Sequence, residues 1–200
     1  MSAHMIDTAP SPWVVRFAPL IPAGTVLDLA CGSGRHSLLL ASLGMQVLAV
    51  DRDAAALQRL SSDRVRTLCA DLEAGDSQSS HPSQLTPAVR ELLHPDHFAG
   101  IVVTNYLYRP LLPLLFASLV DGGVLIYETF AQGNSAFGKP SNPDFLLAHG
   151  ELMDAARGAP CKMRVVAFED GFQVAPRPAM VQRLCALRTD SAPIAQQLVL

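Results

Sequence analysis

The sequence predicts an α/β fold in which helices pack on both faces of a doubly wound, mostly parallel sheet. Three observations support this prediction. Residues 26–43 form a pattern of short buried strand, glycine turn and apolar helix. Strand-like runs then alternate with helix-like runs up to residue 128, as they do in parallel sheets. The last two strand-like runs have no helix between them, which predicts an antiparallel pair at one sheet edge.

The composition favours one domain spanning residues 1–200, because 50% of the residues are apolar and only 16% are charged. The net charge is −3, and the 15 lysines and arginines are scattered along the chain. Binding to nucleic acid is therefore disfavoured. No run approaches the ~18 apolar residues that a bilayer span requires, and the N-terminus lacks the pattern of a signal peptide. We therefore expect a cytoplasmic protein without a membrane segment.

The cysteines and histidines predict no metal site. The four cysteines are far apart and form no Cys-x-x-Cys pair, so we expect small core residues in a reducing compartment. They are Cys31, Cys69, Cys161 and Cys185. Three histidines lie in or beside a polar loop without metal-ligand spacing, and we expect them to be solvated. They are His81, His94 and His97.

Residues 1–20 are expected to form an N-terminal lid or extension. The apolar run 13–17 lies between Pro12 and Pro19, so it can form only a short helix or an extended segment. One interpretation is an apolar cover over a sheet edge. The alternative is that Trp13 and Arg16 close over the cofactor or the substrate.

Seven strands are expected, five in the parallel part and two in the antiparallel pair. The parallel strands are expected at 25–29, 46–50, 65–69, 98–104 and 124–128, and the pair at 163–169 and 180–187. Helices are expected at 37–42, 53–60, 86–93, 111–119 and 151–157. Gly44 and the run Asp121-Gly122-Gly123 are typical stop signals for the helices before them. Residues 75–87, rich in Ser, Gln and Pro, predict a solvated loop.

Polar groups follow the first three strands, where open parallel sheets bind ligands. Gly32 and Gly34 allow a sharp turn and a close approach of the backbone to a ligand. Asp51 follows Gly32 by 19 residues (51 − 32), where a carboxylate can accept hydrogen bonds from ribose hydroxyls. Asp71 can accept from an exocyclic amine such as that of adenine. This pattern predicts a Rossmann-like site for an adenosine cofactor.

Asp28 argues against a dinucleotide. It lies in the apolar strand four residues before the first glycine, where a carboxylate would repel a pyrophosphate at the helix N-terminus. The third glycine of the dinucleotide motif would fall at Ser37. A cofactor carrying a cationic amino-acid group would instead favour an acid here. Asp28 can also stabilise the turn through backbone amides, and the two roles are compatible.

The segment Val-Leu-Asp-Leu-Ala-Cys-Gly-Ser-Gly, with Asp51, Asp71 and the β/α order, resembles the class I S-adenosylmethionine-dependent methyltransferases. The glycine turn is also similar to that of tellurite-resistance-type small-molecule methyltransferases. The resemblance implies that Asp28 and the turn face the methionine end, Asp51 with its neighbour Arg52 the ribose, and Asp71-Leu72 the adenine. The turn residues are Ala30, Cys31, Gly32, Ser33 and Gly34. Ala30 stands where the family usually has glycine.

The resemblance places Asn105, which follows the fourth strand, beside the transferred methyl. The family's Asn/Asp-Pro-Pro-aromatic tetrapeptide for methylating exocyclic amines is missing here, which counts against such acceptors. Tyr106, Tyr108 and Arg109 could line an acceptor pocket, with Tyr106 a candidate catalytic residue. The alternative is aromatic packing over the sheet edge with a solvated arginine.

Residues 129–150 are a candidate substrate lid, because a long connection rich in Gly, Asn and Pro is more often functional than a spacer. Glu128, at the end of the fifth strand, is the best candidate for a general base if the acceptor needs one. Its alternative role is to pair with Lys139 or Arg109. His36, after the glycine turn, could meet the acceptor or be an ordinary polar residue.

The sequence therefore predicts an S-adenosylmethionine-dependent methyltransferase that acts on a small molecule and carries no metal. An RNA or protein methyltransferase, or a protein that binds S-adenosylmethionine without catalysis, are the alternatives. Neither the acceptor atom nor the oligomeric state follows from the sequence, because fold analogy supplies neither.

Overall fold

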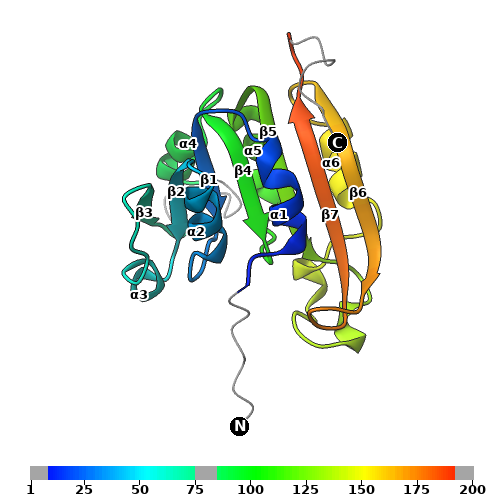
Figure 1. Cartoon of the computed structure of the whole chain (residues 1–200). Coiled ribbons are helices and arrows are strands. Elements are labelled where there is room, and N and C mark those ends of the chain that lie inside the picture. The colour runs from blue at the N-terminus through cyan, green and yellow to red at the C-terminus, as the bar shows by residue number, and fades with distance from the viewer. Residues whose placement is uncertain (1–8, 75–84, 192–200) are drawn as a thin grey trace.

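The computed structural model describes residues 9–74 and 85–191. Its centre is a seven-stranded sheet of order β3-β2-β1-β4-β5-β7-β6 (Figure 1). The strands β1 to β5 pair in parallel, whereas β7 pairs antiparallel with both β5 and β6. The strands are β1 (Thr25–Leu29), β2 (Gln46–Asp51), β3 (Val65–Cys69), β4 (Phe98–Thr104), β5 (Leu119–Phe130), β6 (Met163–Gln173) and β7 (Ala179–Arg188). The predicted fold class, including the antiparallel C-terminal pair, is confirmed.

The helices are short and connect the strands. The α-helices are α1 (Pro12–Phe17), α2 (Arg35–Ser42), α3 (Ala54–Leu57), α4 (Pro87–Leu92), α5 (Leu112–Ser118) and α6 (Glu151–Arg157). The 3-10 helices are η1 (Ala18–Leu20), η2 (Arg109–Leu111), η3 (Asn134–Ala136) and η4 (Pro143–Phe145). Two helices begin at a side-chain cap: the Asp53 side chain accepts from the Ala56 amide, and the Thr86 side chain accepts from the Val89 amide.

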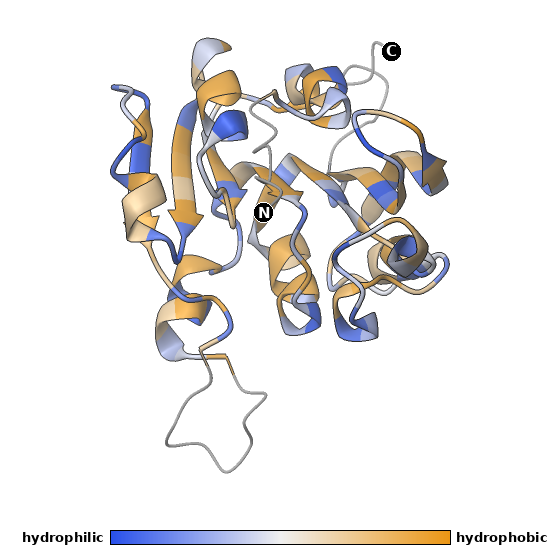
Figure 2. Cartoon of the chain, turned by 90° about the horizontal axis from the view of Figure 1, so that it is seen from below, coloured by the Kyte–Doolittle hydropathy of each residue, from blue (hydrophilic) through white to orange (hydrophobic). Residues whose placement is uncertain are grey.

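Both faces of the sheet are apolar and covered, as expected for central parallel strands. Helices α4, α5 and α6 pack on one face, in the cluster that contains Leu27, Ile101 and Tyr127. Helices α1 and α2 pack on the other, against Val26 and Ile126. Figure 2 shows the resulting layers, with a row of apolar strands between helices. The edge strand β3 is the most exposed one.

The N-terminal helix covers a sheet face rather than a sheet edge. Trp13, Val14 and Phe17 are buried with residues of β4, β5 and β7, and the Trp13 Nε1 donates to the Leu184 carbonyl at 3.3 Å. Trp13 is therefore a core residue, and the prediction of an edge cover is wrong. Residues 1–8 of the expected lid lie outside the described part of the chain, as does most of the predicted loop at 75–87.

Helix α5 and strand β5 meet at a different point from the predicted one. The helix ends at Ser118, and Asp121-Gly122-Gly123 lies inside β5 rather than stopping a helix. The pairing of β5 with β4 shifts register between Phe98 and Gly100, and a Cβ at Gly123 would lie 2.8 Å from the Val120 carbonyl oxygen. The glycine therefore accommodates an irregularity in the strand.

The four cysteines are free thiols in different environments. Cys31 and Cys185 are buried, as predicted, and burial raises the pKa of the Cys185 thiol to about 12. Cys161 is only partly buried, and Cys69 is exposed. The prediction of four core residues is therefore wrong for Cys69, because β3 is an edge strand.

Candidate functional site

The carboxyl ends of β1 to β4 meet at one edge of the sheet and enclose a cavity. Its empty volume is about 580 Å³, including the mouth that opens to solvent. The sheet order reverses between β1 and β4, and such a switch point is where open α/β sheets bind ligands. The lining residues are Ala30, Asp51, Arg52, Ala70, Asp71, Leu72, Glu73, Asn105 and Tyr106.

Seven of these nine residues are predicted site residues. The other two, Ala70 and Glu73, are not predicted from the sequence. Both flank Asp71 and its neighbour Leu72 at the end of β3. The signal that could have found Glu73 is its spacing, because it is a second acid two residues after Asp71. The Asp71 Oδ1 accepts from the Glu73 amide at 3.0 Å, which folds the strand end into a tight turn.

The glycine turn links β1 to α2 beside the cavity. Ala30, Gly32 and Gly34 have φ values of 54°, 55° and 76°, all in the left-handed region. Gly34 precedes α2, and a Cβ there would also overlap the Leu60 side chain, at 2.1 Å. Ala30 is strained, because an L-residue pays of the order of 1–2 kcal/mol in this conformation. A glycine would adopt the backbone conformation of Ala30 without this strain.

Asp51 joins the glycine turn to the end of β2. Its Oδ2 accepts from the Gly32 amide at 2.7 Å, and its Oδ1 accepts from the Asp53 amide at 2.9 Å. The carboxylate therefore fixes the turn while it also lines the cavity. Cys31, Gly32, Ser33 and Gly34 form the turn behind this carboxylate, whereas Ala30 lines the cavity itself.

Asp28 lies beneath the turn, at 1% exposure. Its Oδ2 accepts from the Ser37 hydroxyl at 2.5 Å. Burial raises the pKa of the Asp28 carboxyl to about 7, against the opposing effect of the Ser37 hydrogen bonds. The structure thus gives Asp28 a partner at the start of α2, and the predicted contact with a methionine amino group remains a prediction.

Two bonds to β5 fix the turn after β4. Asn105 adopts a φ of 55°, which asparagine tolerates better than most residues, and its amide donates to the Glu128 carbonyl at 2.9 Å. The Tyr127 hydroxyl donates to the Tyr106 carbonyl, also at 2.9 Å. Burial strongly raises the pKa of Tyr106, with further contributions from the charges of nearby acids. Its phenol is therefore neutral and cannot serve as a base at ordinary pH.

His36 is a buried link at the same edge, with 1% exposure. Its Nε2 accepts from the Ser11 amide at 3.0 Å, which leaves the proton on Nδ1, 3.3 Å from the Thr104 hydroxyl oxygen. It therefore connects the segment before α1 to the end of β4. Neither His36 nor Trp13 lines the cavity.

Arg109 fastens the segment after β5 rather than lining the cavity. Its guanidinium binds both carboxylate oxygens of Glu151, at 2.6 and 3.0 Å, and the carbonyls of Asp144 and Leu146, at 2.7 and 2.9 Å. The Leu147 amide donates to the carbonyl of Phe130, the last residue of β5, at 3.0 Å, and the Gln132 amide donates to the Leu147 carbonyl at 2.9 Å. Much of the predicted lid at 129–150 is thereby held in place. Tyr108 is half-buried and packs against the core.

Glu128 forms an ion pair with Arg183, its neighbour across β5 and β7. The Arg183 Nε lies 2.5 Å from the Glu128 Oε2, and the same guanidinium donates to Glu169 at 2.8 Å and to Gln173. The partner is therefore neither Lys139 nor Arg109. Glu128 does not line the cavity, and its role as a base remains a prediction.

In residues 9–74 and 85–191, no three His, Cys, Asp or Glu side chains form a group that could hold a metal ion. Within the same ranges, none of the helices has the length and apolar character needed to cross a bilayer.

The sheet order, the antiparallel β7 and the acids at the ends of β2 and β3 define the class I S-adenosylmethionine-dependent methyltransferase fold. Solved structures agree with this class. TehB from Haemophilus influenzae superimposes with a TM-score of 0.67 and 20% identity, over 92% of this chain and 64% of that chain. An S-adenosylmethionine-dependent methyltransferase structure from Listeria monocytogenes gives 0.61 and 14%, over 88% of this chain and 98% of that chain. The predicted resemblance is confirmed.

Comparisons of sequence match one part of the chain. Residues 7–76 match the family model described as tellurite resistance protein TehB. This is the part that contains the glycine turn, Asp51 and Asp71. A curated relative, the 23S rRNA (uracil(1939)-C(5))-methyltransferase RlmD of Halomonas elongata, is 37% identical over 70 residues. That match covers 35% of this chain and only 14% of the relative.

Proposed function

We propose that this protein binds S-adenosylmethionine in the cavity at the ends of β1 to β4 and transfers its methyl group to a small-molecule acceptor. The observation that carries the proposal is the placement of Asp51 and Asp71 at the ends of adjacent strands, on one cavity beside the glycine turn. The methyltransferase neighbours and the TehB family match support the same cofactor.

The lining residues fit such a cofactor. Asp51 can accept from two ribose hydroxyls, and Asp71 can accept from the adenine amine. The shielded hydroxyl of Tyr106, which has no hydrogen-bond partner, shows that the wall of the cavity still has a polar atom to satisfy. When bound, the cofactor supplies a methyl group on a sulfonium, which a nucleophile takes by in-line displacement. The protein's part is to align the two reactants and exclude water.

The structure favours an acceptor that needs no protein base. Glu128 is held in an ion pair with Arg183, so proton uptake would disrupt that pair. Tyr106 stays a neutral phenol because its pKa is raised by burial. We therefore propose an acceptor that is already a nucleophile in water, such as a thiolate or a soft oxyanion. Tellurite belongs to this group, and the TehB match makes it a specific candidate.

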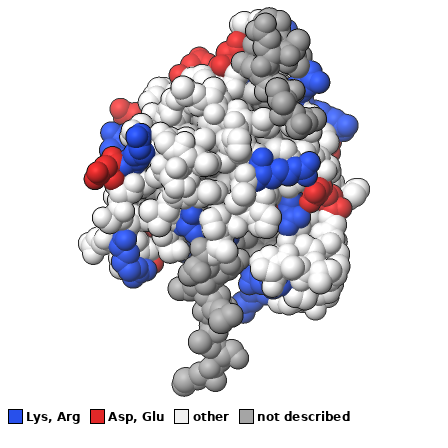
Figure 3. All heavy atoms as spheres, in the orientation of Figure 1, with Lys and Arg blue, Asp and Glu red and all other residues white. Residues whose placement is uncertain are grey.

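A nucleic-acid acceptor is less well supported. The net charge is −3, and Figure 3 shows the lysines and arginines in separate places on one face rather than in a continuous patch. Arg109, Arg183 and Arg188 are engaged in ion pairs with acids. RNA binding usually requires a basic surface. The partial match to RlmD keeps RNA as the second candidate.

Isothermal titration tests the cofactor assignment. We expect S-adenosylmethionine and S-adenosylhomocysteine to bind and NAD to bind more weakly or not at all. We expect Asp51→Asn to weaken binding by about 1–3 kcal/mol, because a charged acceptor for the ribose hydroxyls is lost. Asp63→Asn, the same change at an exposed acid, is the matched control. Tighter binding of NAD, or equal affinity of a folded Asp51→Asn protein, would contradict the assignment.

Turnover assays identify the acceptor. Thiols, phenols, carboxylates, tellurite, selenite and RNA are each incubated with S-adenosylmethionine, and release of S-adenosylhomocysteine is measured. Turnover with a thiol, tellurite or selenite supports the proposal. Turnover with RNA alone would replace the small-molecule acceptor, and cofactor binding without any turnover would favour a non-catalytic binding protein.

A further inference from the structure

Tyr106, in the turn after β4, lines the same cavity as Asp71, Leu72 and Glu73. Besides burial, the charges of Glu73 and Asp71 contribute to the raised pKa of the Tyr106 phenol, so the phenol lies near the turn after β3. If the chain binds S-adenosylmethionine as proposed, the end of the cavity at that turn receives the purine base, because Asp51 takes the ribose. Tyr106 would thus contact the base rather than the methyl group, although the sequence predicts it as a candidate catalytic residue.

The Tyr106 hydroxyl has no partner. Among the residues that the structure describes, its Oη is the one buried side-chain oxygen or nitrogen without a hydrogen bond. Buried hydroxyl groups are nearly always hydrogen-bonded, since an unmade bond is costly. Because the Tyr106 side chain also lines an open cavity, a rotation of this side chain can bring the unpaired donor to a ligand.

The backbone around this side chain is fixed. The Tyr127 hydroxyl holds the Tyr106 carbonyl at 2.9 Å, and the Asn105 amide is held by Glu128. The side chain itself is only partly buried, so it can turn toward a base that fills the cavity. The backbone is therefore fixed and only the side chain has to be ordered on binding, which limits the entropy lost.

The Tyr106 phenol can donate a hydrogen bond, which the neighbouring carboxylates cannot. Ionised carboxylates such as Asp71 and Glu73 only accept hydrogen bonds, so they can bind the amine of adenine but not its ring nitrogens. Ring nitrogens need a donor. The Tyr106 hydroxyl keeps its proton because burial and the charge of Glu73 raise its pKa.

We propose that Tyr106 is a specificity-determining residue of the cofactor site, and that its hydroxyl donates a hydrogen bond to a ring nitrogen of the purine base. This inference rests on the proposed function, since it assumes that the cavity receives S-adenosylmethionine. It assigns Tyr106 to recognition of the base, and it explains why a phenol rather than a phenyl group stands at this position.

Titration of Tyr106→Phe with S-adenosylhomocysteine tests the inference. We expect about tenfold weaker binding, the effect of one lost hydrogen bond. The melting temperature without ligand should be unchanged or higher, because the substitution removes an unpaired hydroxyl. If the hydroxyl stabilised the fold, the substitution would instead lower the melting temperature. Tyr108→Phe is the matched control, because Tyr108 lies two residues away and does not line the cavity; its affinity should equal that of the wild type.

Analogues of S-adenosylhomocysteine with one ring nitrogen replaced by CH identify the contact. The 1-deaza, 3-deaza and 7-deaza compounds are titrated into both proteins. One analogue should bind the wild type about tenfold more weakly and bind Tyr106→Phe as tightly as the parent compound does. Equal affinity of the variant and the wild type for the parent compound, or equal losses for every analogue in both proteins, would overturn the inference. If the wild type binds no S-adenosylhomocysteine, the proposed function fails instead.

Discussion

At the scale of single residues, Asp28 shows how burial changes a side chain's chemistry. The sequence places this acid inside an apolar strand, and the structure buries it completely beside Ser37. Its pKa rises to about 7 because the charged form loses solvent. The folded protein therefore binds a proton at Asp28 more tightly than the unfolded chain does.

This shift predicts a stability that falls as pH rises. Between the ordinary value near pH 4 and the folded value near pH 7, the native state holds more protons at Asp28 than the unfolded state. The contribution of this proton binding to the free energy of unfolding is complete below pH 4 and lost by pH 7. Asp28→Asn should remove this component, so that the variant gains stability relative to the wild type with rising pH. At about 1.4 kcal/mol per pH unit, the gain is limited to about 4 kcal/mol.

Urea unfolding at pH 4, 5.5 and 7.5 measures the effect. Asp63→Asn, at an exposed position, serves as the control and should follow the wild-type pH profile. Parallel profiles for Asp28→Asn and the wild type would show that Asp28 ionises normally in the folded protein.

At the scale of elements, Arg109 organises the segment that the sequence predicts as a lid. The side chain extends from η2 and binds the end of η4 and the first residue of α6. Planar guanidinium groups suit such multiple contacts, whereas an ammonium group cannot make them all. Arg109 therefore ties three points of the segment 143–151 to an earlier loop, in addition to the backbone bonds of Leu147.

Arg109→Lys should loosen this segment with little effect on the whole protein. We expect amide hydrogen exchange at residues 143–152 to accelerate by about tenfold, and global stability to fall by no more than about 1 kcal/mol, because the Arg109 side chain is partly exposed. Mass-spectrometric exchange of peptides measures this. Arg157→Lys, which alters an exposed pair within α6, is the control. Unchanged exchange in Arg109→Lys would mean that backbone bonds alone hold the segment.

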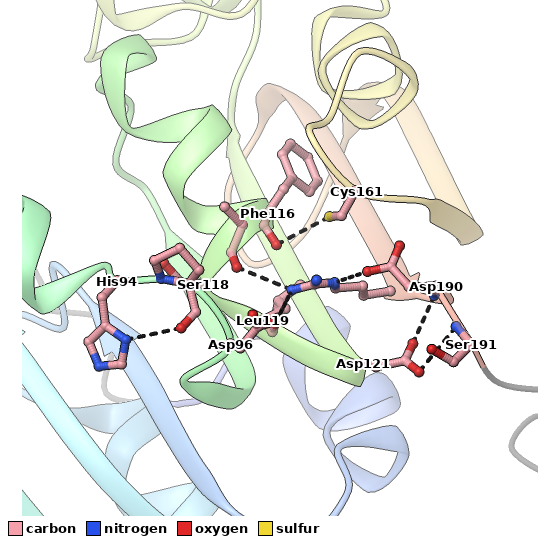
Figure 4. Close-up of polar contacts among 12 residues, drawn as sticks. His94, Asp96, Phe116, Ser118, Leu119, Asp121, Cys161, Asp190 and Ser191 are labelled. Atoms are coloured by element: carbon pink, nitrogen blue, oxygen red, sulfur yellow. Dashed lines mark hydrogen bonds and ion pairs between the residues drawn. The ribbon is translucent and has the colours of Figure 1, made fainter.

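At the scale of the whole molecule, one residue joins the antiparallel pair to the parallel sheet at the amino end of the strands. The guanidinium of Arg188 binds Asp96, Asp190 and the Leu119 carbonyl, three residues that are labelled in Figure 4. Asp96 precedes β4, Leu119 begins β5, and Arg188 ends β7. Arg188 also binds the Ala117 carbonyl at 3.2 Å, so it holds three parts of the fold together.

Removal of this side chain should destabilise the entire protein. Arg188→Ala leaves two backbone carbonyls and two acids without their partner, and we expect a loss of about 2–4 kcal/mol. The midpoint of urea unfolding, followed by circular dichroism, measures the loss. Arg164→Ala, an exposed arginine on the edge strand β6, should change stability by less than about 0.5 kcal/mol. Equal midpoints for the two variants would contradict the role of Arg188.

Much of the fold follows from local patterns. The strand that leads into Asp51 is an apolar run of ordinary length. The strand before Asp71 is a shorter and more exposed run, and helix caps such as Asp53 act within one turn. Because parallel strands end at the same edge, the acids and the glycine turn could be predicted to share one cavity. The ends of short helices, such as α3, are less predictable from the sequence, because caps compete with the packing of neighbouring elements.

The fold class, the glycine turn and the acids at the cavity follow from the sequence alone. They depend on residues close in the chain or on the geometry of parallel strands. Tertiary structure decided the partners of the long polar side chains. Arg183 reaches Glu128 across 55 residues, and Trp13 reaches Leu184 across 171. Such contacts leave no periodic signal, because they arise only when distant elements pack. The same packing leaves the Tyr106 hydroxyl shielded and unpaired, a property that its position in the sequence does not reveal.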